Sequence, residues 1–407
     1  MNNCDQPGLT PVEAALDQIL SAVAPISDST LTGLHNACGR VLSSDVVSPV
    51  AVPPQDNSAM DGYAVSVATS EQYRVIGIAY AGHPFNGTLS PGDAVRIMTG
   101  APVPAGATVV VMQENAVVDG DSVSFKQALI QGDNIRRAGE DIMPGSVVLA
   151  SGRRLTPADC GLLASIGISE VSVVRPLRIA LLTTGDELVT PGQPLANGQI
   201  YESNSYVLTP VLQRLKAEVQ SISALEDSVD AIEVALRDAA AWADIVITCG
   251  GVSVGEADYT RTAVERCGQL ALWKLAMKPG KPLAFGSVGD ALFLGLPGNP
   301  VSSLVTLHQI GLPLLRTLSG ERYETPVRMP AIAAEVFRKR PGRTDFQRGI
   351  ASLNPDGKLQ VRPTGQQGSG MLTSVSQANC FVILEQERGR VETGEYVTIE
   401  LFDQWLS

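Results

Sequence analysis

The stretch DIVITCGGVSVGEADY, from Asp244 to Tyr259, decides the fold that we predict for this chain. Ile245 to Cys249 suit a buried parallel strand, which lacks the polar alternation of a half-exposed one. At Gly250-Gly251, backbone N–H groups can approach an anion closely because glycine has no Cβ. Beyond the turn, Glu256 and Asp258 offer hard oxygen ligands of the kind that Mg²⁺ takes. The alternative is a tight strand–helix turn followed by solvated acids.

The whole chain has 407 residues, which indicates about two to four domains. Its net charge of -12 argues against a general nucleic-acid binder, because such binding depends on neutralising phosphates. No run approaches the roughly 20 apolar residues of a membrane span, and the N-terminus lacks signal-peptide features. The 6 cysteines include no C-x-x-C pair, as expected of free thiols in a reducing compartment. We therefore expect a cytoplasmic protein without nucleic-acid or membrane partners.

The first 176 residues suggest a helical domain interrupted by a β-rich insertion. Thr10 to Glu13 resemble a helix capping box, and the apolar stripe that follows predicts a core-facing helix. Between Asp56 and about Gln131, short β-rich runs separated by Gly and Pro predict a small all-β module. A helix over 156–166 and a strand over 169–174 are expected to rejoin the N-terminal helix, so the module would be an insertion.

From Leu177 onward, strands alternate with helices, which indicates a parallel sheet with helical crossovers. The expected strands are 179–183, 219–224, 245–249, 271–275 and 292–296, and the expected helices are 206–217, 229–241, 259–267 and 300–318. After about Thr325 the strands are short and no helix is predicted. We interpret this last part as a small β barrel or sandwich.

Polar residues follow several strands of the expected sheet, whose carboxyl ends share one edge. They are Asp186, Glu187, Glu226, Asp227, the residues from Gly250 to Asp258, and Gly298-Asn299. Carboxylates gathered at one edge repel each other unless a cation lies among them. Farther along the chain, Lys274, Lys278 and Lys281 form a local group of cations that could hold an anion. This combination is what phosphoryl or nucleotidyl chemistry needs, and the alternative is a merely structural sheet rim.

One other enzyme class matches part of the pattern. Gly251 to Gly255 fits the G-x-S-x-G nucleophile elbow of hydrolases, and Asp290 and His308 follow in the order of that triad. However, His308 lies inside an apolar helical run, whereas a usable base should lie on a loop after a strand. The hydrolase interpretation is therefore disfavoured. The chain also contains no G-x-x-x-x-G-K-[ST] or G-x-G-x-x-G motif.

Seven motifs in order give the chain a family resemblance: DNSAMDGYA, TTGDEL, GGVSVGEAD, KPGKP, GLPGNPVS, DFQRG and QGSG. Together they resemble the molybdopterin molybdenumtransferase family, which includes the E domain of gephyrin. The resemblance implies a transferase that inserts molybdenum from molybdate into adenylyl-molybdopterin with Mg²⁺, releasing AMP and molybdenum cofactor. It also implies an elongated homodimer of four subdomains with shared active sites, the third subdomain resembling molybdopterin adenylyltransferase.

The fold expected on this basis is a multidomain α/β plus β protein. Its parts are an N-terminal helical/β domain (8–52 and 138–176), an inserted β module (53–137), a parallel-sheet α/β molybdopterin-binding domain (177–325) and a C-terminal β-barrel domain (326–407).

The resemblance also implies roles for individual residues. Glu187, Asp227 and Asp258 would be the acids at the nucleotide and metal end, and Lys274 a lysine of the cleft. The molybdate pocket would consist of Lys278, Lys281, Pro282, Arg348 and Ser369. The cofactor-binding turns would be Gly250, Gly251, Ser253, Gly255, Pro297, Gly298, Asn299 and Pro300. Asp61, Thr99 and Asp141 would be contributed by the partner subunit.

Two alternative functions stay open at this point. One is molybdopterin adenylyltransferase activity, which would require ATP. The other is a gephyrin-like scaffold, for which the sequence offers no linker or additional domain. A transient contact with the adenylyltransferase that supplies the substrate is also compatible with the sequence.

Overall fold

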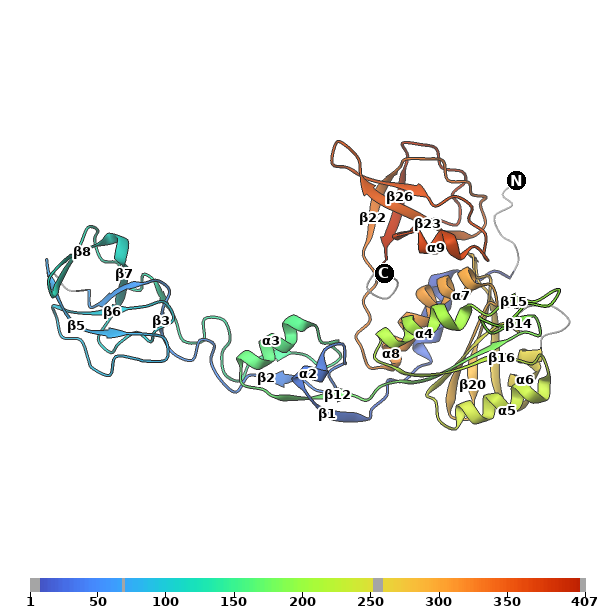
Figure 1. The fold of residues 1–407 in the computed structure, drawn as a ribbon, viewed down its shortest axis with the longest axis horizontal. Helices are drawn as coiled ribbons and strands as arrows, with labels where there is room; N and C mark the ends of the chain where they lie inside the picture. Colours follow the sequence, from blue (N-terminus) through green and yellow to red (C-terminus); the bar gives the residue numbers. More distant parts are fainter. Residues whose placement is uncertain (1–7, 68–69, 252–258, 403–407) are drawn as a thin grey trace.

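The computed structural model describes residues 8–67, 70–251 and 259–402. The molecule is elongated (Figure 1): a six-stranded β module lies at one end, and the α/β sheet and a β barrel lie at the other, with a small helical/β domain between them. None of the helices in these ranges is long and apolar enough to cross a membrane.

The central sheet contains the predicted parallel strands, but it is mixed because one strand is antiparallel to its neighbours. Its strands run in the order β16 (Glu218–Leu225), β13 (Arg178–Thr184), β17 (Ile245–Cys249), β21 (Ala291–Leu296), β20 (Pro282–Val288) and β18 (Gly268–Lys274). Only β20 runs against its neighbours. Val288 pairs with Ala291 across a two-residue turn, and so short a connection can join only antiparallel strands. As a result, Pro282 at the start of β20 lies beside Lys274 at the carboxyl edge of β18.

Helices cover both faces of this sheet (Figure 1). One face packs against α1 (Val12–Ser21), α4 (Asn204–Arg214), α7 (Pro300–Thr306), a π-helical segment (Leu307–Gly311) and α8 (Leu312–Leu318). The other packs against α5 (Val229–Ala240) and α6 (Tyr259–Cys267). Every residue of β17 is buried, with Ile245 and Ile247 in the first core and Val246 in the second. Burial on both faces explains why this strand lacks the alternation of a half-exposed strand.

The helix α1 differs from expectation at its start and in its packing. Its N-cap is Pro11 without a side-chain cap, because Thr10 instead pairs with the end of β18: its amide donates to the carbonyl of Lys274 at 2.8 Å. The predicted capping box is therefore absent. The apolar face of α1 packs with α8 in the core of the central domain, not with residues 156–174.

The small helical/β domain is formed by two segments far apart in the sequence. Strand β1 (Ser29–Gly33) pairs with β12 (Glu170–Val174), and β2 (Val46–Val47) pairs with β11 (Val147–Leu149). Helix α2 (Leu34–Ala37) packs against α3 (Pro157–Ser165). The helix predicted over 156–166 is confirmed as α3, and Thr156 caps it by accepting a hydrogen bond from the amide of Asp159 at 3.2 Å.

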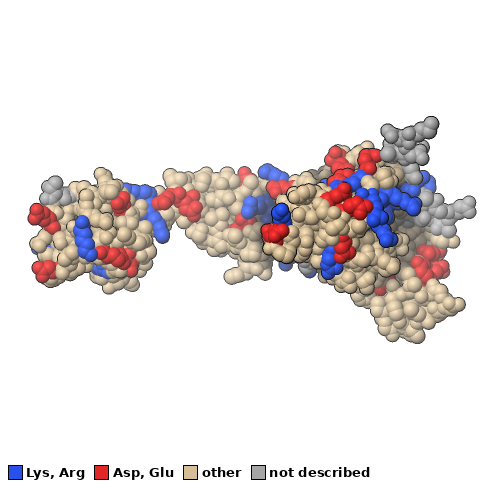
Figure 2. Space-filling model, turned by 90° about the horizontal axis from the view of Figure 1, so that it is seen from above, with Lys and Arg blue, Asp and Glu red and all other residues tan. Residues whose placement is uncertain are grey.

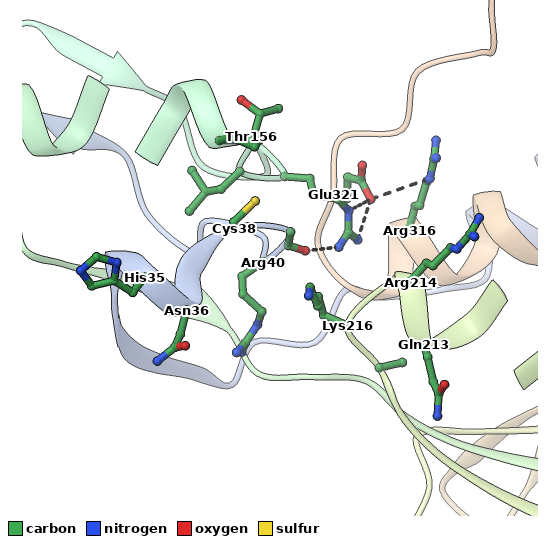
Figure 3. A pocket seen from close by; sticks show the side chains of 15 residues that line it. His35, Asn36, Cys38, Arg40, Thr156, Gln213, Arg214, Lys216, Arg316 and Glu321 are labelled. Carbon is green, nitrogen blue, oxygen red and sulfur yellow. Dashed lines mark hydrogen bonds and ion pairs between the residues drawn. The ribbon is translucent and has the colours of Figure 1, made fainter. Parts of the chain in front are cut away.

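A side chain of this domain ties it to the central domain (Figure 3). Arg154 donates to the carbonyls of Gly39 at 2.6 Å and Leu215 at 3.2 Å, and it forms an ion pair with Glu321 at 2.8 Å. A hollow of about 950 Å³ lies beside this contact. It is distant from the strand-end loops and contains none of the residues predicted for the site.

The β module is one sheet in the order β7 (Val109–Met112), β4 (Gly62–Val65), β6 (Asp93–Ile97), β5 (Tyr73–Ala79), β9 (Ser122–Phe125) and β8 (Ala116–Asp119). A 3₁₀ turn (Gln113–Asn115) follows β7, and β3 (Asn57–Ser58) pairs with β10 (Ile135–Arg136). Strand β4 follows a stretch of turn-forming residues, yet all four of its own residues are buried, and it pairs with β6 on one side and β7 on the other.

The C-terminal domain is a closed five-stranded barrel, as predicted. Its strands are β22 (Arg328–Ala333), β23 (Thr344–Leu353), β24 (Leu359–Pro363), β25 (Cys380–Leu384) and β26 (Tyr396–Leu401), and β23 closes the ring by pairing with both β24 and β25. A short helix, α9 (Leu372–Ser376), was not predicted. Strand β19 (Met277–Lys278) of the central domain pairs with β23, so the two domains share a sheet edge.

Candidate active site

A cleft of about 710 Å³ lies where the carboxyl edge of the central sheet meets the barrel. Loops after β13, β16, β17 and β21 line it, together with the segment from Lys278 to Pro282 and the barrel loop 367–369. It brings together many of the residues singled out from the sequence: Glu187, Asp227, Gly250, Gly251, Lys278, Lys281, Pro282, Pro297, Gly298, Asn299, Pro300 and Ser369. Ser253, Gly255 and Asp258 lie outside the described residues.

The two glycine turns pack side by side on the floor of the cleft. The amide of Gly250 donates to the carbonyl of Leu296 at 3.2 Å, which joins the ends of β17 and β21. Gly251 has a φ of +62°, and a Cβ there would lie 1.9 Å from Oγ1 of Thr260. Asn204 fixes the second turn by donating to the carbonyl of Gly298 at 2.8 Å. The backbone is therefore exposed to a ligand and held in place.

One end of the cleft is acidic. Glu187 follows β13 and Asp227 follows β16, and the amide of Asp227 donates to Oδ1 of Asp186 at 3.0 Å. Burial raises the pKa of the Asp227 carboxyl, and the negative charges of Asp186 and Glu187 add to that increase. A cation at this end would relieve the repulsion among these carboxylates.

The two carboxylates at the acidic end are enough to bind Mg²⁺, but they are too few for a metal ion whose ligands all come from the protein. Within the described ranges, no three His, Cys, Asp or Glu side chains come close enough to hold a metal ion. However, Mg²⁺ commonly takes only one or two carboxylates and completes its shell with water and substrate phosphates. Glu187 and Asp227 fit that donor set, whereas the third predicted ligand, Asp258, is not among the described residues.

The other end of the cleft is basic and spans two domains. Lys278 and Lys281 come from the segment between β18 and β20, and Nζ of Lys278 lies 3.2 Å from Oδ2 of Asp345 in the barrel. The amide of Thr344 donates to the carbonyl of Ala276 at 2.8 Å, which reinforces this junction. Arg343 adds a third cation to the lining.

Ser369 lies in a barrel loop that is fastened to the central domain. Its carbonyl accepts a hydrogen bond from the amide of Val301, at the start of α7, at 3.0 Å. The neighbouring Gln367 also lines the cleft, and its side-chain amide donates to the carbonyl of Arg348 at 3.1 Å. The barrel thus contributes both polar side chains and backbone to the basic end.

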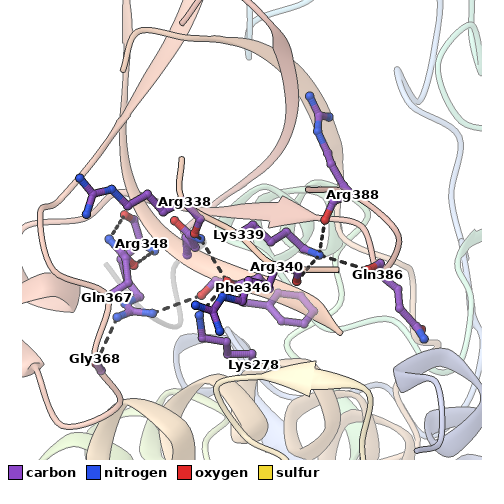
Figure 4. A network of polar contacts seen from close by, with 12 residues as sticks. Lys278, Arg338, Lys339, Arg340, Phe346, Arg348, Gln367, Gly368, Gln386 and Arg388 are labelled. Atoms are coloured by element: carbon purple, nitrogen blue, oxygen red, sulfur yellow. Dashed lines mark hydrogen bonds and ion pairs between the residues drawn. The ribbon is translucent and has the colours of Figure 1, made fainter. Parts of the chain in front are cut away.

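Arg348 does not face the cleft, which differs from its expected place in the molybdate pocket. It is 0% exposed, and its guanidinium donates to Oγ of Ser374 at 3.0 Å and to the carbonyl of Gly368 at 3.2 Å (Figure 4). Burial lowers the pKa of Arg348 to about 10. In this structure Arg348 supports the 367–369 loop from inside the barrel.

His308 and Lys274 lie outside the cleft lining. His308 is buried in the π-helical segment, where its ring packs against Phe381 and burial lowers its pKa to about 4. It therefore cannot serve the cleft as the base of a hydrolase triad. Lys274 ends β18 at the correct edge of the sheet, but it is exposed and does not line the cleft.

Asp61 and Thr99 meet at the far end of the molecule, in the β module (Figure 1). The amide and the hydroxyl of Thr99 both donate to Oδ1 of Asp61, each at 2.7 Å. These hydrogen bonds, the one from the amide first, lower the pKa of the Asp61 carboxyl. Asp141 is exposed in the segment that returns from the module, where its amide donates to the carbonyl of Val52 at 3.0 Å. Within one chain, these three residues do not approach the cleft.

Sequence reasoning missed several residues of the lining. Gln367 belongs to the quoted QGSG motif, and Arg343 lies two residues before DFQRG, so both carried a local signal. Asn204 had a weaker signal, as a polar residue at the start of a helix. Tyr259 and Ile200 carried none, since only the fold brings their side chains to the cleft.

Comparison with known proteins matches three parts of the chain to models of protein families. Residues 10–167 match the MoeA N-terminal region (domain I and II), residues 180–317 a probable molybdopterin binding domain, and residues 330–402 the MoeA C-terminal region (domain IV).

Individual relatives agree with these matches. A molybdopterin molybdenumtransferase of Haemophilus influenzae is 44% identical, with 97% of this chain and 99% of the relative covered. One of Synechococcus elongatus is 36% identical, with 95% and 98% covered. The solved structure of a molybdopterin biosynthesis moeA protein from Pyrococcus horikoshii aligns with a TM-score of 0.82 at 28% identity, covering 97% of this chain and 100% of that one. The chain belongs to the molybdopterin molybdenumtransferase family.

Proposed function

We propose that this protein transfers molybdenum from molybdate to adenylyl-molybdopterin and releases AMP and molybdenum cofactor. One observation carries the proposal: a single cleft joins carboxylates at one end to lysines at the other across two exposed glycine turns. A substrate that carries a phosphoanhydride needs charge neutralisation at one end of the site. A dianionic oxyanion needs cationic and hydroxyl donors at the other.

Each end of the cleft has a distinct part in this reaction. Glu187 and Asp227, with Asp258, would hold Mg²⁺, which when bound supplies positive charge to the phosphoanhydride. The backbone of Gly250-Gly251 and of Pro297 to Pro300 would hold the pterin phosphate, together with Ser253 and Gly255 of the same sequence motif. Lys278, Lys281, Pro282 and Ser369 would bind molybdate, Lys274 would assist from the sheet edge, and Arg348 would position the 367–369 loop.

We also propose that the enzyme is a cytoplasmic homodimer whose sites are shared between subunits. Support comes from Figure 1, in which the β module lies at the opposite end of the chain from the α/β sheet and the barrel. Asp61 and Thr99 belong to that module, whereas the cleft is lined by loops of the sheet and the barrel. A second copy could bring those residues, and Asp141, to the cleft through an isologous interface. The five cysteines among the described residues are free thiols, in keeping with a reducing compartment.

The four-part division of the chain is likewise a proposal. The pairing of β1 with β12 supports a discontinuous N-terminal domain (8–52 and 138–176) around the inserted module (53–137). The packing of α1 against α8 favours moving that helix to the α/β domain (177–325), while the barrel keeps residues 326–407.

The test is incubation of the purified protein with adenylyl-molybdopterin, molybdate and Mg²⁺, following AMP release. We expect release that requires molybdate and is suppressed by a chelator of Mg²⁺. A parallel reaction with ATP and free molybdopterin should produce no adenylyl-molybdopterin. Adenylylation there, with molybdate-independent AMP release in the first reaction, would instead favour the adenylyltransferase.

A further inference from the structure

A second, strongly basic pocket of about 880 Å³ adjoins the cleft on the barrel side. It shares Lys278, Lys281 and Arg343 with the cleft and adds Arg338, Arg340 and Arg390. Figure 2 shows Lys and Arg side chains gathered over the barrel end of the molecule. Such a concentration of cations is unexpected in a chain with a net charge of -12.

Most of these cations lack a protein partner. Within the described part of the chain, the side chains of Lys281, Arg338, Arg340 and Arg343 make no hydrogen bond or ion pair with the protein; only the backbone carbonyls of Arg338 and Arg340 accept hydrogen bonds from side chains. Many arginines elsewhere are paired, for example Arg175 with Asp244 at 2.7 Å. Like charges that share a concave surface repel each other, and a bound anion would remove that repulsion.

The wall that carries Arg338 and Arg340 is fixed in advance. Lys339, between them, is 7% exposed, and its Nζ donates to the carbonyls of Arg388 at 2.7 Å and Gln386 at 3.1 Å (Figure 4). The amide of Gly342 also donates to the carbonyl of Gln386, at 2.8 Å. Because the loop is pinned from inside, the exposed arginines on either side of Lys339 lose little backbone entropy when an anion binds.

We propose that this pocket is a second oxyanion site, which captures tetrahedral dianions such as molybdate before they enter the cleft. The inference rests on the proposed function, which makes molybdate the substrate. The wall formed by Lys278, Lys281 and Arg343 is common to both spaces, so an oxyanion can pass between them without leaving cationic side chains. Guanidinium groups suit this ligand because their planar forks bind two oxygens at once.

The test compares Arg338→Gln/Arg340→Gln with Arg362→Gln. Arg362 lies on β24 of the same barrel, is exposed, and does not line either pocket, so its variant controls for lost charge. Molybdate binding is measured first by equilibrium dialysis without any pterin, with sulfate as the competing dianion. Initial rates of AMP release are then measured against molybdate concentration.

We expect the double variant to bind molybdate more weakly and to raise the KM for molybdate about tenfold at low ionic strength. The kcat at saturating molybdate and the KM for adenylyl-molybdopterin should stay at wild-type values. The effect should shrink as salt is added, because salt screens exposed charges. Sulfate should compete with molybdate in the wild type, and Arg362→Gln should behave as wild type.

Several results would overturn the proposal. Unchanged molybdate binding by the double variant would exclude an oxyanion site, and a raised KM for the pterin substrate alone would assign the pocket to that substrate. A defect seen only when adenylyltransferase supplies the substrate would indicate a protein-docking surface. Thermal unfolding and the Arg338→Lys/Arg340→Lys variant, which should keep most of the binding, exclude misfolding as the cause. If the wild type binds molybdate but releases no AMP, the proposed function fails while the dialysis still tests the pocket.

Discussion

The Nζ of Lys278 lies 3.2 Å from Oδ2 of Asp345, and this ion pair joins the central domain to the barrel at the rim of the cleft. Lys278 also pairs with Asp345 through the backbone, as β19 runs beside β23. The same lysine therefore has two roles open to it: it can offer charge to an anion, and it can fasten two domains.

Two substitutions separate these roles. Lys278→Gln and Asp345→Asn both break the ion pair, but only the first removes the positive charge from the cleft. The Lys278 side chain is 46% exposed but that of Asp345 only 4%, so Lys278→Gln leaves a buried carboxylate without its ion pair. We expect that variant to lose more stability than the roughly 1 kcal/mol of an exposed ion pair, and Asp345→Asn to lose less than Lys278→Gln. Lys278→Gln should raise the KM for molybdate roughly 10- to 100-fold, since a charge-assisted hydrogen bond contributes about 1.5–3 kcal/mol.

Asp345→Asn should keep the wild-type KM for molybdate within a few-fold. The measurements are AMP release against molybdate concentration and thermal unfolding of all three proteins. Equal loss of activity in both variants would mean that Lys278 acts by holding the domains together.

Asp227 should make the apo protein less stable at neutral pH. Burial raises its pKa in the folded state above the unfolded value near 3.9. Between those two values the folded protein binds more protons than the unfolded chain, so stability falls as the pH rises through that window. Above it, the carboxylate destabilises the folded state in full, and below the unfolded pKa the penalty is absent.

We therefore expect Asp227→Asn to have a higher Tm than the wild type at neutral pH in EDTA, and the difference to vanish in acid. Added Mg²⁺ should raise the Tm of the wild type more than that of the variant. Thermal unfolding across pH, with and without Mg²⁺, measures both effects. A variant that is less stable than the wild type at neutral pH would show that the carboxylate is satisfied by the protein alone.

His308→Gln should leave AMP release near the wild-type rate, because the ring is buried outside the cleft, against Phe381 and 3.5 Å from Oε1 of Glu400. Its pKa is lowered to about 4 from an ordinary value near 6.5. The histidine thus contributes stability that is complete above about pH 6.5 and is lost progressively as the pH falls through about 4.

The His308→Gln variant should not lose this stability in acid. For a pKa lowered from near 6.5 to about 4, the loss in the wild type amounts to about 3 kcal/mol. Denaturant unfolding at several pH values measures it. Abolished activity in a well-folded His308→Gln protein would revive a base role for the histidine.

Most elements of the central domain could be predicted because their own residues show a recognisable hydrophobic pattern. β17 was predicted at its true bounds, since a strand buried on both faces is apolar along its length. β20 was missed because its direction depends on a hairpin with β21, and the proline at its start argued against a strand. The four buried residues of β4 were hidden behind turn-forming neighbours.

The site residues that directly follow a strand could be predicted from the pattern of the sequence. Those that the barrel domain contributes to the cleft could not. Glu187, Asp227 and the glycine turns share an edge by the rules of parallel sheets. The sequence around Arg348 does not indicate that its side chain points into the barrel. Side chains alternate along β23, and the sequence does not say whether that of Arg348 faces the barrel interior or the cleft. Arg343 reaches the cleft only because β19 and β23 pair.

The separation of Asp61 from Asp227 within one chain leads to a test of the shared site. Asp61→Asn and Asp227→Asn should each be inactive as purified homodimers, because both of their sites carry the lesion. After mixing and random re-association at equal amounts, about half of the dimers are heterodimers. Each heterodimer collects both lesions in one site and leaves the other site intact. Activity should therefore return to roughly a quarter of the wild-type value.

Asp61 is exposed, so its substitution should not prevent folding or subunit exchange. Exchange is followed with differently tagged subunits, and dimer formation by sedimentation. Verified exchange with no recovery of activity would assign all of these residues to sites within single chains.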